Sequence, residues 1–215
     1  MHLKMRQAVR IMLCAACAAA VLLLLNTTAS AQTTDVFSVT YFDNANTASA
    51  PVALVHVLNP GNGALCADIY VLGADQELSE CCSCPITPNG LLTFDVNTAT
   101  ANPGDSHPPR VSGSIDIIAD STANCTDANA AAPTPTPDLR AWATHINFDT
   151  VSGGFDVTED EFLDTPLSSG EQSELAVRCG FFLANDTGAG VCNAICTEAS
   201  PTPAVKTGAK AAAKH

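Results

Sequence analysis

The stretch DQELSECCSCPITPNGL, residues 75–91, decides how the rest of the chain is arranged. It holds three cysteines within four residues, Cys81, Cys82 and Cys84, and a Pro/Gly turn at residues 87–90 follows them. These cysteines can bond to different distant segments, because adjacent residues do not readily close the preferred disulfide geometry on each other. We therefore interpret the stretch as a covalent hub in a mainly β domain.

The cysteine count favours a disulfide framework. Cys14 and Cys17 lie in the N-terminal apolar run, and the remaining cysteines form an even set, which in an exported chain indicates disulfides. Their pairing stays open, because such a set allows about a hundred connectivities. Cys81 and Cys82 are expected to have different partners, since consecutive residues of an extended chain point to opposite faces. The predicted disulfide cysteines are Cys66, Cys81, Cys82, Cys84, Cys125, Cys179, Cys192 and Cys196. The four that follow the hub in sequence are its expected anchors.

Two other chemistries compete with disulfides at the hub. Cys81 and Cys84 have the C-x-x-C spacing of thioredoxin-like redox motifs, but such a motif requires a βαβ setting, and the surrounding pattern is β. Zinc binding by the hub thiolates together with Cys192 and Cys196 is the second alternative. The hub does not supply the regular, matched cysteine pairs of a structural zinc site, so disulfides are favoured.

The N-terminus has the three parts of a secretory signal peptide. Lys4, Arg6 and Arg10 precede an apolar run at residues 11–25, and Ala-Ser-Ala at 29–31 is a small-x-small cleavage site. The apolar run is shorter than the ~20 residues that a membrane-spanning helix needs, and no later apolar run is long enough. We therefore expect a secreted, periplasmic or cell-envelope protein with no transmembrane segment after cleavage.

Three regions are expected along the chain. Residues 1–31 are the predicted signal peptide, 32–200 a single β-rich disulfide domain, and 201–215 a disordered tail rich in Lys, Ala and Pro. The chain has 22 acidic and 9 basic residues and a net charge of −13. Such an acidic chain lacks the positive surface that nucleic-acid binding requires. The sequence does not identify the partner, and a cell-envelope polymer or a protein is the expected class.

Hydrophobic alternation and turn residues predict an antiparallel, sandwich-like β fold. The predicted strands span residues 33–42, 52–59, 65–72, 91–96, 111–119 and 139–148. The first three are expected to form a meander, and the nearly continuous apolar run at 52–59 predicts a strand buried on both faces. Short helical turns are predicted over 74–82 and 158–163.

One helix is predicted near the C-terminus. Ser168, followed three residues later by Glu171, has the pattern of a capping box. Leu175, Cys179 and Phe182 follow at helical spacing, so their side chains share one face. We expect this face to lie in the core, with Cys179 stapling the helix to the β domain.

The sequence contains none of the common catalytic motifs, so no catalytic residue and no organic cofactor is predicted. His56, His107, His145 and His215 share no metal-ligating spacing. The best candidate site is an acidic cluster of five carboxylates within nine residues, a pattern that suits calcium. Its members are Asp156, Glu159, Asp160, Glu161 and Asp164. A solvated acidic surface explains the same cluster more simply.

The hub, together with TPTPDLRAWATHI at 134–146 and TEDEFLDTPLSSGE at 158–171, resembles a group of uncharacterised exported cysteine-rich proteins of acidobacterial type. The shared core is CC-x-CP-x-TPNGL, and the resemblance covers most of the mature chain. It implies secretion and a common disulfide-rich domain. No activity is attached to that group, so the resemblance assigns no catalytic residue here.

We expect an exported, non-enzymatic structural or interaction protein of unknown ligand. Two alternatives stay open, a secreted hydrolase and a calcium-dependent binding module. A pocket with two carboxylates, or His145 beside an activated hydroxyl, would favour the hydrolase. A calcium-induced rise in melting temperature would favour the calcium module.

Overall fold

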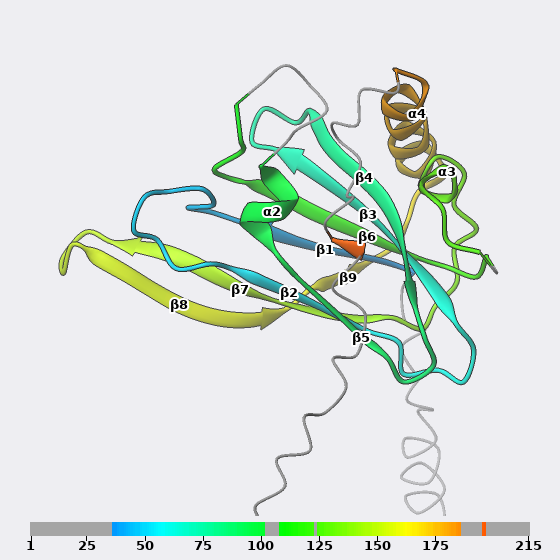
Figure 1. Cartoon of the computed structure of the whole chain (residues 1–215), viewed down its shortest axis with the longest axis horizontal. Coiled ribbons are helices and arrows are strands. Elements are labelled where there is room, and N and C mark those ends of the chain that lie inside the picture. Colours follow the sequence, from blue (N-terminus) through cyan, green and yellow to red (C-terminus); the bar gives the residue numbers. More distant parts are fainter. Residues whose placement is uncertain (1–35, 102–107, 123, 186–194, 197–215) are drawn as a thin grey trace, which may run out of the picture. The chain divides into compact units, whose positions relative to one another are not determined.

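The computed structural model describes residues 36–101, 108–122, 124–185 and 195–196. The predicted signal peptide and the predicted tail lie outside these residues. The described residues form two antiparallel sheets and three helices (Figure 1). The predicted class, a mainly β sandwich with one disulfide-stapled C-terminal helix, is confirmed. In the part of the chain that the structure describes, no helix has the length and apolar character to span a membrane.

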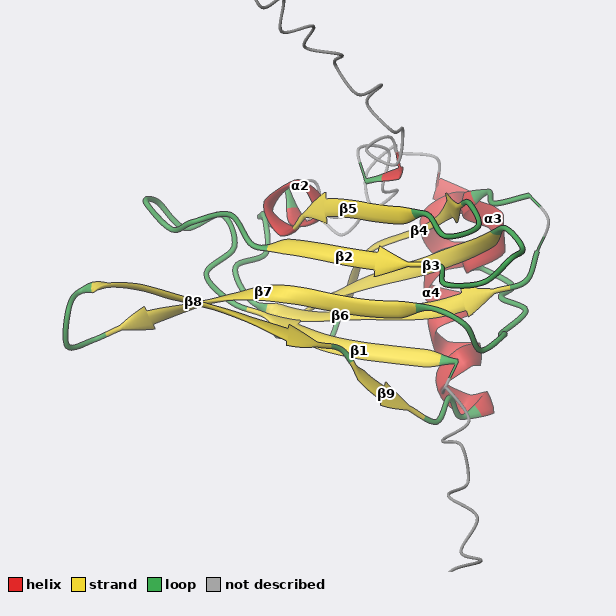
Figure 2. Cartoon of the chain, turned by 90° about the horizontal axis from the view of Figure 1, so that it is seen from below, coloured by secondary structure: helices red, strands yellow, loops and turns green. Residues whose placement is uncertain are grey.

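The two sheets contain nine strands. The five-stranded sheet has the order β4 (Leu78–Ile86), β3 (Leu65–Gly73), β6 (Gly113–Asp120), β1 (Phe37–Phe42) and β9 (Leu163–Thr165). The four-stranded sheet has the order β5 (Leu91–Asp95), β2 (Leu54–Leu58), β7 (Arg140–Asp149) and β8 (Gly154–Glu161). β7 and β8 form a hairpin that extends past the other strands at one end (Figures 1 and 2).

The main core lies between the sheets because alternate residues of each strand turn the same way. Its buried members include Val55, Val57, Phe94, Ile69, Ile115 and Ile117, which come from both sheets. The alternation predicted for 139–148 is confirmed as far as His145, since Ala141, Ala143 and His145 are buried while Arg140 is exposed. It breaks at Ile146, which was predicted on the Arg140 face and is buried. Each large apolar side chain buried here stabilises the fold by roughly 1.5–3 kcal/mol.

A second core covers the outer face of the five-stranded sheet. Helices α3 (Asp127–Ala130) and α4 (Ser169–Asn185) pack there against Tyr70, Cys81 and Ile118. The Tyr70 hydroxyl donates a hydrogen bond to the Ala130 carbonyl at 2.7 Å. The N-terminus of α4 follows the capping prediction, because the Ser168 hydroxyl accepts the Glu171 N–H at 3.1 Å. The buried stripe of α4 is Leu175, Cys179 and Phe182.

The hub is a strand, and the helical turn predicted over 74–82 is wrong. A tight turn closes between Gly73 and Glu77, where the Gly73 N–H donates to the Glu77 carbonyl at 2.9 Å. β4 then pairs along its length with β3. Pairing with β3 satisfies the backbone groups, and this tertiary contact outweighs the local helical preference of 74–82.

Three further expectations are wrong. β1 and β3 share a sheet but are separated by β6, and β2 belongs to the other sheet, so the first three strands form no meander. β2 is buried on one face only, because Leu54 is exposed whereas Val55 is not. The turn predicted over 158–163 is the end of β8, which pairs with β7 up to Glu161. A short helix that was not predicted, α2 (Val96–Thr100), follows β5.

Candidate functional site

The three hub cysteines are oxidised. Cys81 bonds to Cys179 of α4, and Cys84 bonds to Cys196. Cys82 is also disulfide-bonded. The different partners expected for adjacent cysteines are therefore confirmed. Because β4 alternates, Cys81 joins the core under α4, whereas Cys82 and Cys84 join the core between the sheets.

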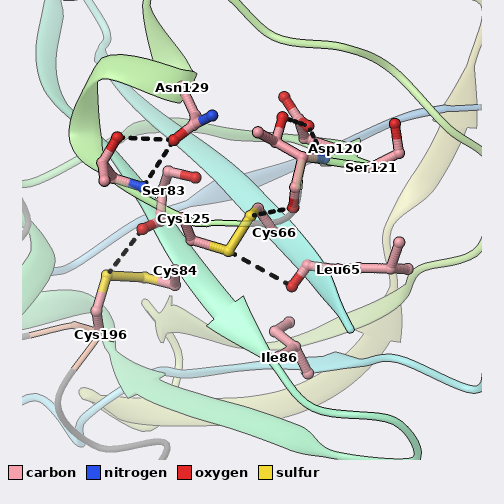
Figure 3. Close-up of a disulfide and its surroundings, with 12 residues drawn as sticks. Leu65, Cys66, Ser83, Cys84, Ile86, Asp120, Ser121, Cys125, Asn129 and Cys196 are labelled. Atoms are coloured by element: carbon pink, nitrogen blue, oxygen red, sulfur yellow. Dashed lines mark hydrogen bonds between the residues drawn. A yellow bond between two sulfur atoms is a disulfide. The ribbon is translucent and has the colours of Figure 1, made fainter. Parts of the chain in front are cut away.

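Cys125 does not anchor the hub. It bonds to Cys66, near the start of β3, at a sequence separation of 59. Figure 3 shows this disulfide beside Cys84–Cys196, whose Cys196 sulfur lies 3.7 Å from the Ser83 carbonyl oxygen. Cys192 lies outside the described residues.

The sulfurs of Cys82, Cys84 and Cys196 lie within 4.8 Å of one another and are the one group of metal-ligand type among the described residues. All three are held in disulfides, and zinc binds the thiolate form. The disulfides therefore explain the proximity of these sulfurs. The redox reading is not supported either, because Cys81 and Cys84 bond to different segments rather than to each other.

A pocket of about 540 Å³ lies at the opposite side of the sandwich. It is lined by Val39, Thr40, Tyr41, Ser114, His145, Asp160, Glu161 and Leu163. The pocket exists because β9 is short and pairs with β1 only from Phe37 to Val39. From Thr40 onward, β1 has no strand on that side among the described residues.

The chain crosses from one sheet to the other beside this pocket. β8 ends at Glu161, β9 begins at Leu163, and Phe162 between them is buried. The Phe162 N–H donates to the Ala141 carbonyl at 2.9 Å, which holds the crossing against β7.

His145 is the most deeply buried polar residue that lines the pocket, with 2% of its surface exposed. Its Nε2 lies 3.5 Å from the Thr40 hydroxyl, and the Tyr41 ring stacks on the imidazole at a centroid distance of 4.2 Å. Nδ1 is buried and has no partner of hydrogen-bond geometry among the described residues. Burial lowers the pKa of His145, and the negative charge of Asp160 opposes this shift. The ring is therefore neutral at pH 7.

The acidic cluster predicted as a calcium site lies along the two edge strands. Direct pairing of Asp160 with the buried Ala143 places its side chain on the inner face of β8, and Glu161 lies on the other face. On β9, Asp164 accepts a hydrogen bond from the Ser38 hydroxyl at 3.0 Å. Within the described ranges, no three of the five carboxylates come close enough to share one ion. Calcium binding stays a prediction, and the melting temperature in millimolar calcium tests it.

His56 is not among the residues that line the pocket. His56 lies in the four-stranded sheet, where Nδ1 is 2.9 Å from the Thr93 hydroxyl and the ring stacks on Trp142. His107 and His215 lie outside the described residues. The residues that sequence reasoning missed are Thr40 and Tyr41, because no local pattern indicates that β1 faces β7 across the core.

A second polar cluster, which the sequence did not predict, is buried on the outer face of the five-stranded sheet. Asp68 is fully buried opposite Ser83, and both its carboxyl oxygens lack a partner of hydrogen-bond geometry. Burial is the main cause that raises the pKa of Asp68 to about 8, and the charge of Asp120 adds to it. The Asp120 carboxylate is fully buried as well and accepts the backbone N–H groups of Thr122 and Thr134. Asp68 is therefore a neutral acid at pH 7.

Comparison with known proteins assigns no family. No protein-family model matches the chain, and no curated protein matches it. Among solved structures, the crystal structure of Thermotoga maritima 1070 is similar, with 12% identity, a TM-score of 0.38, and coverage of 61% of this chain and 94% of that one. A similarity at this level carries no argument, and what this chain does is inferred from its own residues.

Proposed function

We propose that this chain is an exported, non-enzymatic interaction protein that binds a cationic side chain of a protein partner in the pocket between β1 and β8. Several disulfides indicate an oxidising environment outside the cytoplasm. The predicted signal peptide supports export to the medium, the periplasm or the cell envelope.

The charge of the pocket lining carries this proposal. Asp160, on the inner face of β8, and its neighbour Glu161 make the lining acidic, and none of the described lining residues is a lysine or arginine. Tyr41, which is half exposed, and Leu163 provide an aromatic face and an apolar wall. Carboxylates beside an aromatic ring suit the alkyl stem and charged head of Lys or Arg. Neutral His145 adds no positive charge that would oppose a cation.

Calorimetry of the full chain with a short Arg- and Lys-containing peptide tests the proposal. Binding is expected at low salt and is expected to weaken as salt rises, because exposed charges are screened. Asp160→Asn combined with Glu161→Gln should weaken binding at least about tenfold, which corresponds to ~1.4 kcal/mol. Asp138→Asn, an exposed acid that is not among the residues lining the pocket, is the matched control. Equal binding by the two variants would contradict the proposal.

A secreted hydrolase is the second candidate, because His145 lies beside the Thr40 hydroxyl in a pocket whose lining includes Asp160 and Glu161. A general base must approach the hydroxyl to within about 2.6–3.2 Å in the reactive complex, so the observed contact would have to shorten. Assays against aryl esters and glycosides with wild type and Thr40→Val decide this. Hydrolysis by wild type that Thr40→Val abolishes would favour the hydrolase over the interaction protein.

A further inference from the structure

We infer that the chain's own lysine-bearing C-terminal segment, residues 201–215, occupies the open edge of β8 and β9, so that a partner must displace it. The inference deepens the proposed function and rests on it, since both use the carboxylates around the pocket. It names the occupant of this edge in the free protein.

The spacing of the charges supports this occupant. Asp156, Asp160 and Asp164 follow one another at intervals of four residues along β8 and β9. Lys206, Lys210 and Lys214 have the same interval, and no acidic residue lies in 201–215. An even interval keeps side chains on one face of an extended chain. Within β8, Asp156 and Asp160 therefore repeat at the ~13 Å interval that the lysines have in an extended segment, and Asp164 follows where the chain has crossed to β9.

The edge that would receive the segment is open. β8 has β7 on one side, and no described strand pairs with its other side. Such an edge presents free backbone N–H and C=O groups to an added strand. A second copy of this chain is a poor occupant, because pairing two β8 edges places carboxylate against carboxylate. A basic strand is the complementary occupant.

The start of the segment is held within reach. Cys196 bonds to Cys84 of β4, and β4 and β9 are the two outer strands of the same sheet. Four strand spacings separate these strands, or ~19 Å. Ten residues from Cys196 to Lys206 span up to ~33–36 Å, which allows a path around the sandwich.

The register of the sheet also gives a direction. Asp164 of β9 pairs with Ser38 of β1. The row of directly paired residues that starts there runs across β6 and β3 and ends at Cys82 of β4. Cys84, which holds Cys196 ahead of the segment, therefore lies only two residues along β4 from the row of Asp164. It would meet β9 first and then follow β8 backwards, as an antiparallel strand. Lys206 then lies opposite Asp164, Lys210 opposite Asp160, and Lys214 opposite Asp156.

Tethering makes weak contacts sufficient. Exposed ion pairs contribute little individually, but a segment joined to its site by a short linker has an effective concentration of ~1 mM or more. Free peptide must compete with this concentration. The full chain should therefore bind an external basic peptide more weakly than a chain ending at Ser200, which retains every cysteine of the framework.

Zero-length carbodiimide cross-linking of the full chain, read by mass spectrometry, tests the register. At low salt we expect Lys210–Asp160 as the main intramolecular link, with Lys206–Asp164 beside it. Both should disappear in ~0.5 M salt because screening is then nearly complete. Asp160→Lys should abolish the Lys210 link, and adding Lys210→Asp should restore a link in the reverse sense. Asp138→Lys is the control and should change neither. Links spread evenly over the acidic residues, or formed only between molecules, would overturn the inference.

Peptide calorimetry separates the two proposals. Truncation after Ser200 is expected to tighten peptide binding about tenfold, because the competing segment is gone. Equal affinity for the full and truncated chains, with Asp160→Asn still weakening both, would remove the tail from the edge and keep the proposed function. Absence of binding by both chains would reject the proposed function, and with it the role of the tail as a competitor.

Discussion

The two lateral sides of the sandwich are built in opposite ways. On the β4 side, every hub cysteine is disulfide-bonded, and a tight turn at 87–90 carries the chain from β4 into β5. On the β8 side, the strands end at a pocket rimmed by carboxylates, with one short strand covering part of β1. The disulfides of the β4 side stabilise the fold, so the β8 side, which we call the open side, can keep an unpaired edge. The open side is thereby available for binding.

Removing the hub's bond to α4 should cause the largest change. Cys81→Ala with Cys179→Ala opens a bridge between residues 98 apart in sequence, and we expect a loss of about 2–5 kcal/mol. Urea unfolding without reductant measures it. Under full reduction the variant and wild type should become nearly equally stable, because wild type then lacks the same bond. An unchanged midpoint without reductant would show that α4 docks without the staple.

Stability should fall as pH rises because of Asp68. Its folded pKa is about 8, whereas its ordinary value is 3.8. The folded state therefore keeps a proton that the unfolded state releases. The contribution of the Asp68 carboxyl to the free energy of unfolding is complete below pH 3.8. It is lost as pH rises toward 8, at roughly 1.4 kcal/mol per pH unit.

Asp68→Asn should flatten this dependence, and urea midpoints at pH 5 and pH 8 measure it. The variant should be more stable than wild type at pH 8, because a neutral amide replaces a group that must bury a charge or hold a proton. Glu80 and Asp116 also have raised pKa values, of about 8 and about 7, so a smaller slope should remain. Asp138→Asn is the control. An unchanged slope in Asp68→Asn would contradict the burial argument.

On the open side, Tyr41→Ala should have a moderate effect. The stack on His145 is worth about 0.5–1.5 kcal/mol, and its loss admits water to the imidazole. We expect the pKa of His145 to rise toward its ordinary value, because burial is what lowers it. An NMR pH titration follows the ring. Phe148→Ala is the matched control, since Phe148 and Tyr41 are 52% and 51% exposed.

The smallest change in stability is expected for the edge carboxylates. Asp156→Asn with Asp160→Asn should shift the unfolding free energy by less than about 0.5 kcal/mol, because both side chains are exposed. Self-association should increase instead, since charges on an edge strand oppose pairing with another chain. Sedimentation velocity measures this. A loss of several kcal/mol would show that the open edge supports the fold.

Much of the fold could be predicted because its patterns are local. The alternation at 139–148 and the Ser168 cap needed no knowledge of the partner strand. The errors at 74–82 and 158–163 have one physical cause. Both runs are rich in charged or helix-favouring residues, and pairing with β3 and β7 overrode that preference.

The candidate site could be predicted only in pieces. His145 and the carboxylates were recognisable as groups that bear chemistry, but Thr40 and Tyr41 looked like ordinary strand residues. Thr40 and His145 are 105 residues apart, and they meet because their strands lie in facing sheets. The sequence did not indicate that Asp68 is buried either, since a single Asp in a strand usually faces solvent.

The sequence by itself determined the oxidised framework, the acidic character, the strand-rich class and the capped helix, because composition, cysteine parity and short-range periodicity act locally. The tertiary structure alone decided which cysteines bond, which strands form edges, and where the pocket opens. Those outcomes depend on contacts between segments far apart in sequence, and these contacts stabilise the protein only once the sheets have packed together.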